Sequence, residues 1–222
     1  MHQDITRVLV IRHGETAWNR ESRIQGHIDI PLNDQGRWQA ARLGQALADE
    51  PLAAIYSSDL QRAHDTALAV GDVCGVPVVT TEALRERHFG EMEGLTHDEI
   101  LRRWPVEGRR WRERDPSFGP NGGETLQAFY DRCVGTATRL ASAHPGQTIA
   151  LVAHGGVLDC FYRAANRLPV SVPRAWTITN ASVNRLLYSP EGFTMLSWAD
   201  DRHLQEQDGG LDEATDGVVA PA

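Results

Sequence analysis

The chain has 222 residues, of which 41% are hydrophobic and 23% charged, a composition typical of a globular protein with one large core. Its formal net charge is -8, but five of the 30 acidic residues follow Arg202, the last basic residue, so the preceding part is nearly neutral. This balance excludes a basic nucleic-acid surface and a polybasic membrane anchor, and the absence of lysine excludes a Walker lysine and a Schiff-base lysine.

Neither the cysteines nor the N-terminus indicates a secreted or membrane protein. The three cysteines, Cys74, Cys133 and Cys160, are odd in number and widely spaced, so we expect buried thiols in a reducing compartment. The first residues include an acid and only a short apolar run follows them, which fits neither a signal peptide nor a transmembrane helix. We therefore expect a cytoplasmic protein with no membrane partner.

Short apolar runs and helical patterns alternate through most of the chain. The runs typical of buried strands are 8–11, 53–56, 77–80 and 149–153. Asn33 and Asp34 begin a helical pattern that extends toward Glu50, and a second pattern with similar capping residues covers 57–74. This alternation predicts an α/β fold, with a mostly parallel sheet flanked by helices on both faces.

The second half of the chain predicts one more core helix, a hairpin and a tail. Apolar residues recur at helical spacing at Leu126, Phe129, Cys133, Ala137 and Leu140, and we expect Glu124 in the first turn of this helix. The strand-like stretches 182–189 and 193–200 flank a turn, which predicts a C-terminal hairpin of edge strands. Residues 205–222 are polar, acidic and glycine-rich, so we expect a disordered tail.

Two of the predicted strands end in the same way, with a histidine followed by a glycine. His13 follows the first strand and His154 the fourth, and ligands of open parallel sheets bind beyond such carboxyl ends. The glycines, Gly14 and Gly155, would let the backbone turn sharply and bring N–H groups close to a ligand. Two histidines and a carboxylate could also hold a metal ion, so a metal site is the rival interpretation.

Arginines at the same edge of the sheet favour an anion over a metal ion. Arg12 precedes His13, and its permanent charge would repel a divalent cation and attract an anion. Arg62 is expected in the first turn of the helix after the second strand, where the helix dipole also favours an anion. Histidines and arginines together therefore predict a phosphate site without a metal ion.

Five stretches, taken together, resemble the histidine phosphatase superfamily, the clan of the cofactor-dependent phosphoglycerate mutases. They are RHGETAWN, SSDLQRAHDTA, LRERHFGEMEGL, GGET and VAHGG, in that order, and the resemblance extends from Arg7 to about Leu196. It implies a single phosphoglycerate mutase-like domain over residues 1–204, with a cap segment around 95–120. For a phosphatase of this clan we expect no cofactor.

The resemblance also implies a role for each residue of the predicted site. His13 would be the nucleophile that attacks phosphorus, while Arg12, Arg62 and His154 would hold the phosphoryl oxygens. Glu86 would protonate the leaving oxygen and then activate the water that cleaves the phosphohistidine. The further phosphate-binding positions are Asn19, Gln25 and Gly155. A surface role is the alternative for Glu86, because three more acids lie close to it, Glu82, Glu91 and Glu93.

Details of the motifs favour a phosphomonoesterase acting on a small phosphorylated metabolite. Phe89 stands where the mutases usually carry a tyrosine, and His97 stands where their lysine would hold the substrate carboxylate. A cofactor-dependent phosphoglycerate mutase is the alternative, and a binding module without turnover is a third hypothesis. We expect a small-molecule phosphate ester as the partner, and the chain could form a homodimer.

Segment 102–114 is rich in arginine. Its six arginines are Arg102, Arg103, Arg109, Arg110, Arg112 and Arg114. One interpretation is a solvated helix whose arginines pair with nearby acids. The other is that the cap recognises a second anionic group of the substrate, with Arg109 and Arg110 as the candidates because Gly108 precedes them.

Overall fold

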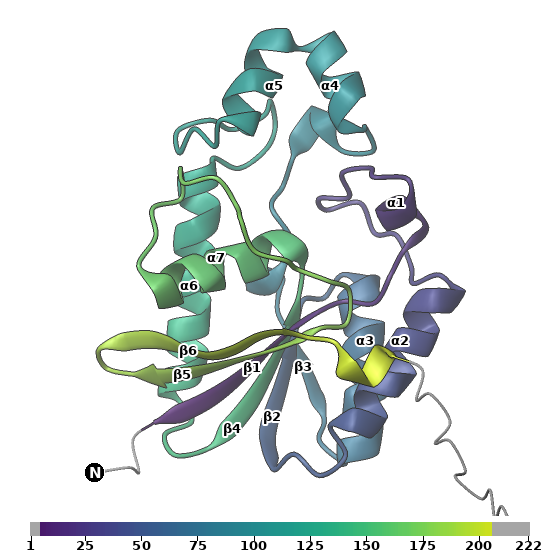
Figure 1. Cartoon of the computed structure of the whole chain (residues 1–222), viewed down its shortest axis with the longest axis vertical. Coiled ribbons are helices and arrows are strands. Elements are labelled where there is room, and N and C mark those ends of the chain that lie inside the picture. Colours follow the sequence, from purple (N-terminus) through teal and green to yellow (C-terminus); the bar gives the residue numbers. More distant parts are fainter. Residues whose placement is uncertain (1–4, 206–222) are drawn as a thin grey trace, which may run out of the picture.

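The computed structural model describes residues 5–205, which form a six-stranded sheet with helices on both faces (Figure 1). In the order in which they pair, the strands are β3 (Val78–Thr80), β2 (Leu52–Ser57), β4 (Thr148–Ala153), β1 (Thr6–Arg12), β5 (Val183–Ser189) and β6 (Gly192–Asp200). The first four are parallel, whereas β5 pairs antiparallel with β1 and β6 antiparallel with β5. The predicted α/β class, with a C-terminal hairpin at the sheet edge, is confirmed. The expected disorder of the tail falls on 206–222, outside the described residues.

The helices carry most of the remaining residues. They are α1 (Ala17–Arg20), α2 (Asp34–Ala46), α3 (Gln61–Cys74), α4 (His97–Arg103), α5 (Pro105–Arg112), α6 (Leu126–Ser142) and α7 (Gly155–Asn166). Three short 3-10 turns are η1 (Glu82–Leu84), η2 (Gly90–Met92) and η3 (Arg202–Leu204). Within residues 5–205, no helix has both the length and the apolar character that crossing a membrane requires.

Alternate residues of β1 face two separate helical layers. Val8 and Val10 belong to an apolar cluster with residues of α6 and α7, and Leu9 and Ile11 belong to a second cluster with residues of α2 and α3. All four side chains are buried. A strand covered on both faces needs apolar residues at every position, which explains the uninterrupted apolar run of β1.

The ends of α2 and α3 show which capping signals operate. Asn33 caps α2 by accepting a hydrogen bond from the N–H of Gly36 at 2.8 Å, as its position predicts, although α2 ends at Ala46 and so is shorter than expected. α3 has no side-chain cap. Asp59, which precedes this helix, accepts a hydrogen bond from Nε of Arg85 at 2.8 Å.

α6 forms the predicted core helix but begins later than expected. All five residues of its predicted apolar stripe are buried. Thr125 is the N-cap and accepts a hydrogen bond from the N–H of Ala128 at 3.1 Å, so Glu124 lies outside the helix and its predicted place in the first turn is wrong. The three cysteines are free thiols, but Cys74 is only half-buried because it lies at the exposed C-terminal end of α3.

α4 and α5 lie apart from the two main helical layers (Figure 1). Met92, Ile100 and Phe118 form a separate apolar cluster there, with Trp104 and Trp111 packed against it. These two helices fall inside the segment for which a cap is predicted. The boundaries of the domain stay a prediction.

Candidate active site

His13 and His154 lie side by side at the carboxyl ends of β1 and β4. The two strands are adjacent and parallel, with Arg12 opposite Ala153, so the residues that follow them meet at one edge of the sheet. The two imidazole centroids are 5.2 Å apart, and the residues are 3% and 0% exposed. The structure thus brings together the two histidines that the repeated motif singled out.

A hydrogen bond determines the tautomer of His13. Nδ1 lies 2.6 Å from the carbonyl oxygen of Gly14, and because a carbonyl can only accept, Nδ1 carries the proton. Nε2 of the neutral ring therefore keeps its lone pair. Burial, together with the charges of Arg62 and Arg12, lowers the pKa of His13 well below its ordinary value, so the ring is neutral at pH 7.

Arg62 connects the first turn of α3 to His154. Its Nη atoms donate to the carbonyl oxygens of Ile28 and Gly26 at 2.9 and 2.8 Å, and its Nε donates to Nδ1 of His154 at 3.2 Å. Burial, reinforced by the charge of Arg62, lowers the pKa of His154 well below its ordinary value, so this ring is neutral too. Since Nδ1 accepts, the proton lies on Nε2, a buried donor with no partner within residues 5–205.

Arg12 adds a second guanidinium to the same edge. Its Nη1 donates to the carbonyl oxygen of Ile178 at 2.7 Å, whereas its buried Nε has no partner in the described part of the chain. Burial lowers the pKa of both Arg12 and Arg62 to about 10, so both remain charged at pH 7. Two cations and an unpaired donor on His154 favour an anion with several acceptor oxygens.

The predicted site residues surround a cavity of about 170 Å³. Seven of the eight line it directly: Arg12, His13, Asn19, Gln25, Arg62, Glu86 and Gly155. The eighth, His154, contacts the lining residue Arg62. Among residues 5–205, no three metal-ligating side chains come together, which leaves the rival metal interpretation without a ligand set there.

Other residues at the cavity were missed in the sequence. Arg23 and Phe89 line it, and Asn180 supports it by donating to the carbonyl oxygen of His13 at 2.9 Å and to Oδ1 of Asn19 at 3.3 Å. Arg23 and Asn180 fall in no motif. Phe89 falls in one, but only as a difference from the mutases.

Glu86 lies at the N-terminus of α7. Its Oε2 accepts a hydrogen bond from the N–H of Gly156 at 2.9 Å, and its Oε1 accepts one from the N–H of Arg87 at 2.8 Å. A Cβ atom on Gly156 would overlap Oε1 of Glu86, whereas a Cβ on Gly155 would make only an ordinary contact of 3.5 Å with Nε of Arg12. The glycine that the close approach requires is therefore Gly156, one residue after the predicted one.

The neighbouring acids do not share this position. Glu82 and Glu91 are exposed. Glu93 accepts hydrogen bonds from the backbone N–H groups of His27 and Phe89 at 3.0 and 2.9 Å, so it holds two loops together. Of these four acids, Glu86 is the one that lines the cavity.

A larger cavity of about 450 Å³ adjoins the first, and Glu86 and Phe89 line both. Trp111 and Phe129 contribute apolar walls to it. Its arginines are Arg87, Arg112, Arg114 and Arg174. The arrangement provides space for a polar or anionic group next to the carboxyl group of Glu86.

The structure does not bring the expected arginines, Arg109 and Arg110, to this cavity. Arg110 forms an ion pair with Asp115 at 2.8 Å, and Arg109 lines a different hollow with Leu101. The prediction that Arg109 and Arg110 recognise a second anionic group of the substrate is therefore wrong for this cavity. Arg112 lines both this cavity and the hollow of Arg109, because it ends α5 one turn further along the same face.

One edge of the parallel sheet brings together a neutral histidine, two buried cations and a carboxyl group. The sequence matches the histidine phosphatase superfamily (branch 1) over residues 8–201, and the chain therefore belongs to this superfamily. The resemblance seen in the five motifs is thereby confirmed.

Individual relatives show how far the similarity extends. Phosphoglycerate mutase-like protein 4 of Arabidopsis thaliana is 40% identical, over 91% of this chain and 89% of its own length. The metal-independent phosphoserine phosphatase of the same plant is 34% identical, over 100% of this chain and 92% of its own. The solved structure of a mycobacterial glucosyl-3-phosphoglycerate phosphatase with VO3 has a TM-score of 0.78 and 33% identity, covering 87% of this chain and 99% of that one. These phosphatase relatives confirm the predicted enzyme class, a phosphoric monoester hydrolase.

Proposed function

We propose that the protein is a phosphomonoesterase that hydrolyses a small phosphorylated metabolite through a phosphohistidine at His13. The observation that carries this proposal is the state of His13, a neutral ring whose Nδ1 donates to Gly14, beside the cations Arg12 and Arg62. Such a ring offers Nε2 as a nucleophile at pH 7, and the cations offset the negative charge of the incoming phosphate ester.

The reaction would proceed in two steps. Nε2 of His13 attacks phosphorus, the bond to the leaving oxygen breaks, and the carboxyl group of Glu86 gives that oxygen its proton. Arg12, Arg62 and the Nε2–H of His154 stabilise the phosphoryl oxygens as charge develops on them. In the second step Glu86, now a carboxylate, takes a proton from the water that attacks phosphorus, and His13 leaves as the neutral ring.

The alcohol part of the substrate would occupy the larger cavity. Arg112 and Arg174 line this cavity, and neither forms an ion pair within the described residues. An ester with a second anionic group, such as a carboxylate, would pair with them. Phosphoserine and glucosyl-3-phosphoglycerate, named for two of the relatives, both carry a carboxylate, which supports this class of substrate.

A panel of phosphomonoesters, assayed with wild type and with His13→Ala, tests the proposal. We expect the variant to lose turnover on every ester, and brief reaction of the wild type to trap an acid-labile, base-stable phosphoryl group on His13. Full activity of His13→Ala would contradict the mechanism. Mutase activity is the second candidate, favoured by the 40% identity to a mutase-like protein. With bisphosphoglycerate present, a mutase would isomerise phosphoglycerate faster than it releases phosphate.

A cytoplasmic location and a homodimer are further parts of the proposal. Three free cysteines support a reducing compartment, and a small phosphorylated metabolite would be met there. Cell fractionation tests the location. Light scattering of the full chain tests the assembly, with a mass of one chain contradicting the homodimer.

A further inference from the structure

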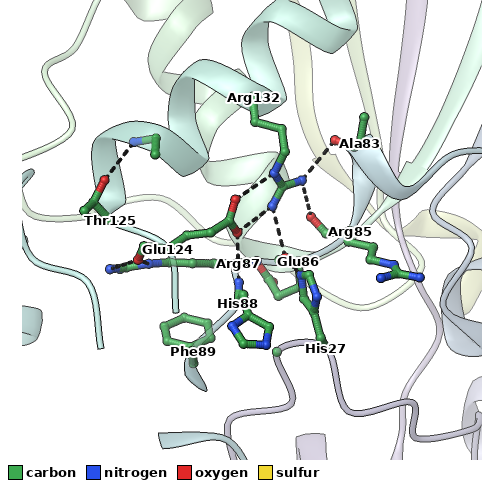
Figure 2. A network of polar contacts seen from close by, with 12 residues as sticks. His27, Ala83, Arg85, Glu86, Arg87, His88, Phe89, Glu124, Thr125 and Arg132 are labelled. Carbon is green, nitrogen blue, oxygen red and sulfur yellow. Dashed lines mark hydrogen bonds and ion pairs between the residues drawn. The ribbon is translucent and has the colours of Figure 1, made fainter. Parts of the chain in front are cut away.

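The segment that carries Glu86 has no regular secondary structure between η1 and η2, and side chains hold it together with the backbone bond from the N–H of Glu124 to the carbonyl oxygen of His88 at 2.9 Å (Figure 2). The backbone N–H groups of residues 87, 88 and 89 each donate to a carboxylate, those of Glu86, Glu124 and Glu93, at 2.8, 2.9 and 2.9 Å. A strand or helix would hold such a segment by backbone hydrogen bonds. Here the conformation around the proton donor depends on charged side chains from other parts of the chain.

Arg132 of α6 is the largest contributor to this arrangement. Its Nη1 donates to the carbonyl oxygens of Ala83 and Arg85 at 3.0 Å each, and its Nη2 donates to the carbonyl oxygen of Glu86 at 3.2 Å (Figure 2). Its Nε and Nη2 also bind the two carboxylate oxygens of Glu124 at 2.8 and 2.7 Å. The guanidinium therefore makes five hydrogen bonds, three of them to the backbone that leads to Glu86.

We propose that Arg132, oriented by Glu124, is a positioning residue for the proton donor Glu86. Neither Arg132 nor Glu124 lines the two cavities, and Arg132 bonds directly to the carbonyl oxygen of Glu86, so we assign its effect to the position of Glu86. The inference rests on the proposed role of Glu86. A carboxyl group that must meet a leaving oxygen loses most of its effect when it moves by about 1 Å, which explains why its backbone would need a rigid clamp.

The five hydrogen bonds made by the Arg132 guanidinium require an arginine. Five N–H groups in one plane can bind a carboxylate on one edge and several carbonyl oxygens on the other, which a lysine ammonium cannot do. Arg132 and Glu124 are both partly shielded from water, with side chains 23% and 25% exposed. The pair is therefore better suited to holding one geometry than an ion pair on the open surface.

The test compares two esters that differ in their need for a proton donor. p-Nitrophenolate leaves without protonation, whereas the alkoxide of an alkyl phosphate does not, so Glu86 matters chiefly for the alkyl ester. kcat/KM reports the steps up to phosphoryl transfer to His13 and omits the later hydrolysis. We expect Arg132→Met to lower kcat/KM roughly 10- to 100-fold for the alkyl ester, but less than about threefold for p-nitrophenyl phosphate.

Two further variants separate this inference from the proposed function. Glu86→Gln alone should also lower kcat/KM more for the alkyl ester than for the aryl ester. If this variant lowered kcat/KM equally for both esters, Glu86 would not be the proton donor. When Arg132→Met is added to Glu86→Gln, we expect no further loss for the alkyl ester. A further loss there, or equal losses for both esters in the single variant, would overturn the positioning role.

A matched control and a milder change complete the design. Arg139→Met removes an exposed arginine from the same helix, and we expect wild-type kcat/KM on both esters. If Arg132→Met does not fold, as judged by thermal unfolding, Glu124→Gln removes the ion pair but keeps the side-chain volume. We expect a loss of about threefold or more confined to the alkyl ester. Equal losses on both esters from Glu124→Gln would overturn the proposal.

Discussion

Nε of Arg62 donates to Nδ1 of His154 at 3.2 Å, and this bond determines which ring nitrogen of His154 carries the proton. The proton lies on Nε2, where a phosphoryl oxygen can accept it. The guanidinium of Arg62 thereby orients the neutral Nε2–H donor of His154, whose ring lies beside that of His13. Arg62 also donates to the backbone carbonyl oxygens of Gly26 and Ile28, so it fixes the position of α3 relative to the loop before α2.

Removal of His154 should weaken the reaction without abolishing it. His154→Ala deletes one donor to the developing charge but keeps the nucleophile, so we expect kcat to fall by about 100-fold. Steady-state kinetics on p-nitrophenyl phosphate measures the effect. Trapping of the phosphoryl group on His154 rather than His13 would reverse the assignment of the two rings.

His13 should stay neutral in mildly acidic solution. Its pKa is lowered by burial and by the charges of Arg62 and Arg12, so protonation occurs only as the pH falls well below the ordinary value of about 6.5. Activity should therefore be lost through protonation of His13 only as the pH falls through that lower pKa. NMR titration of the histidine ring signals checks this directly. A His13 titration near 6.5 would contradict the environment described.

The two glycines at the start of α7 should differ in their tolerance of alanine. A Cβ on Gly156 would overlap Oε1 of Glu86 and displace the carboxyl group, so Gly156→Ala should lower kcat/KM for an alkyl phosphate by at least about tenfold. Gly155→Ala meets Arg12 only at an ordinary contact distance and should cost much less. Kinetics of both variants on one ester decides the point, and a larger loss in Gly155→Ala would refute it.

Arg112 and Arg174 should contribute to the binding of anionic substrates. Arg112→Ala and Arg174→Ala should each raise KM for an ester that carries a carboxylate by roughly tenfold, because each removes one charged hydrogen-bond partner. KM for p-nitrophenyl phosphate, which has no carboxylate, should change little. Arg109→Ala is the matched control, since Arg109 does not line the larger cavity. Similar KM changes for both esters would mean that these arginines do not contact the substrate.

Activity should not depend on a divalent metal ion. In the proposed mechanism Arg12 and Arg62 supply the positive charge that a metal ion would otherwise provide, so exhaustive chelation should leave kcat unchanged. Vanadate, which mimics pentavalent phosphorus, should inhibit at micromolar concentration. Activity that disappeared with the chelator and returned with added metal would restore the rival interpretation.

The sequence predicted those parts of the site that follow from adjacent strands. An uninterrupted apolar run identifies a strand covered on both faces, and parallel neighbours end at the same edge, so His13 and His154 could be expected to meet. Arg62 followed from its place in the first helical turn after a strand. Glu86 could be assigned only through the resemblance to a family, because it lies in an irregular segment where no periodicity indicates which way a side chain points.

Tertiary structure decided which of several chemically equal residues take part. Arg109 and Arg112 occupy the same short helix and line one hollow together, but the packing of α5 brings only Arg112 of the two to the larger cavity as well. Arg132 gives no sign in the sequence that its guanidinium reaches the backbone of Glu86, 46 residues away. Local sequence determines where strands and helices begin because capping and burial act over a few residues. Which side chains share a cavity depends on contacts between elements far apart in the chain, and these exist only after the elements have packed.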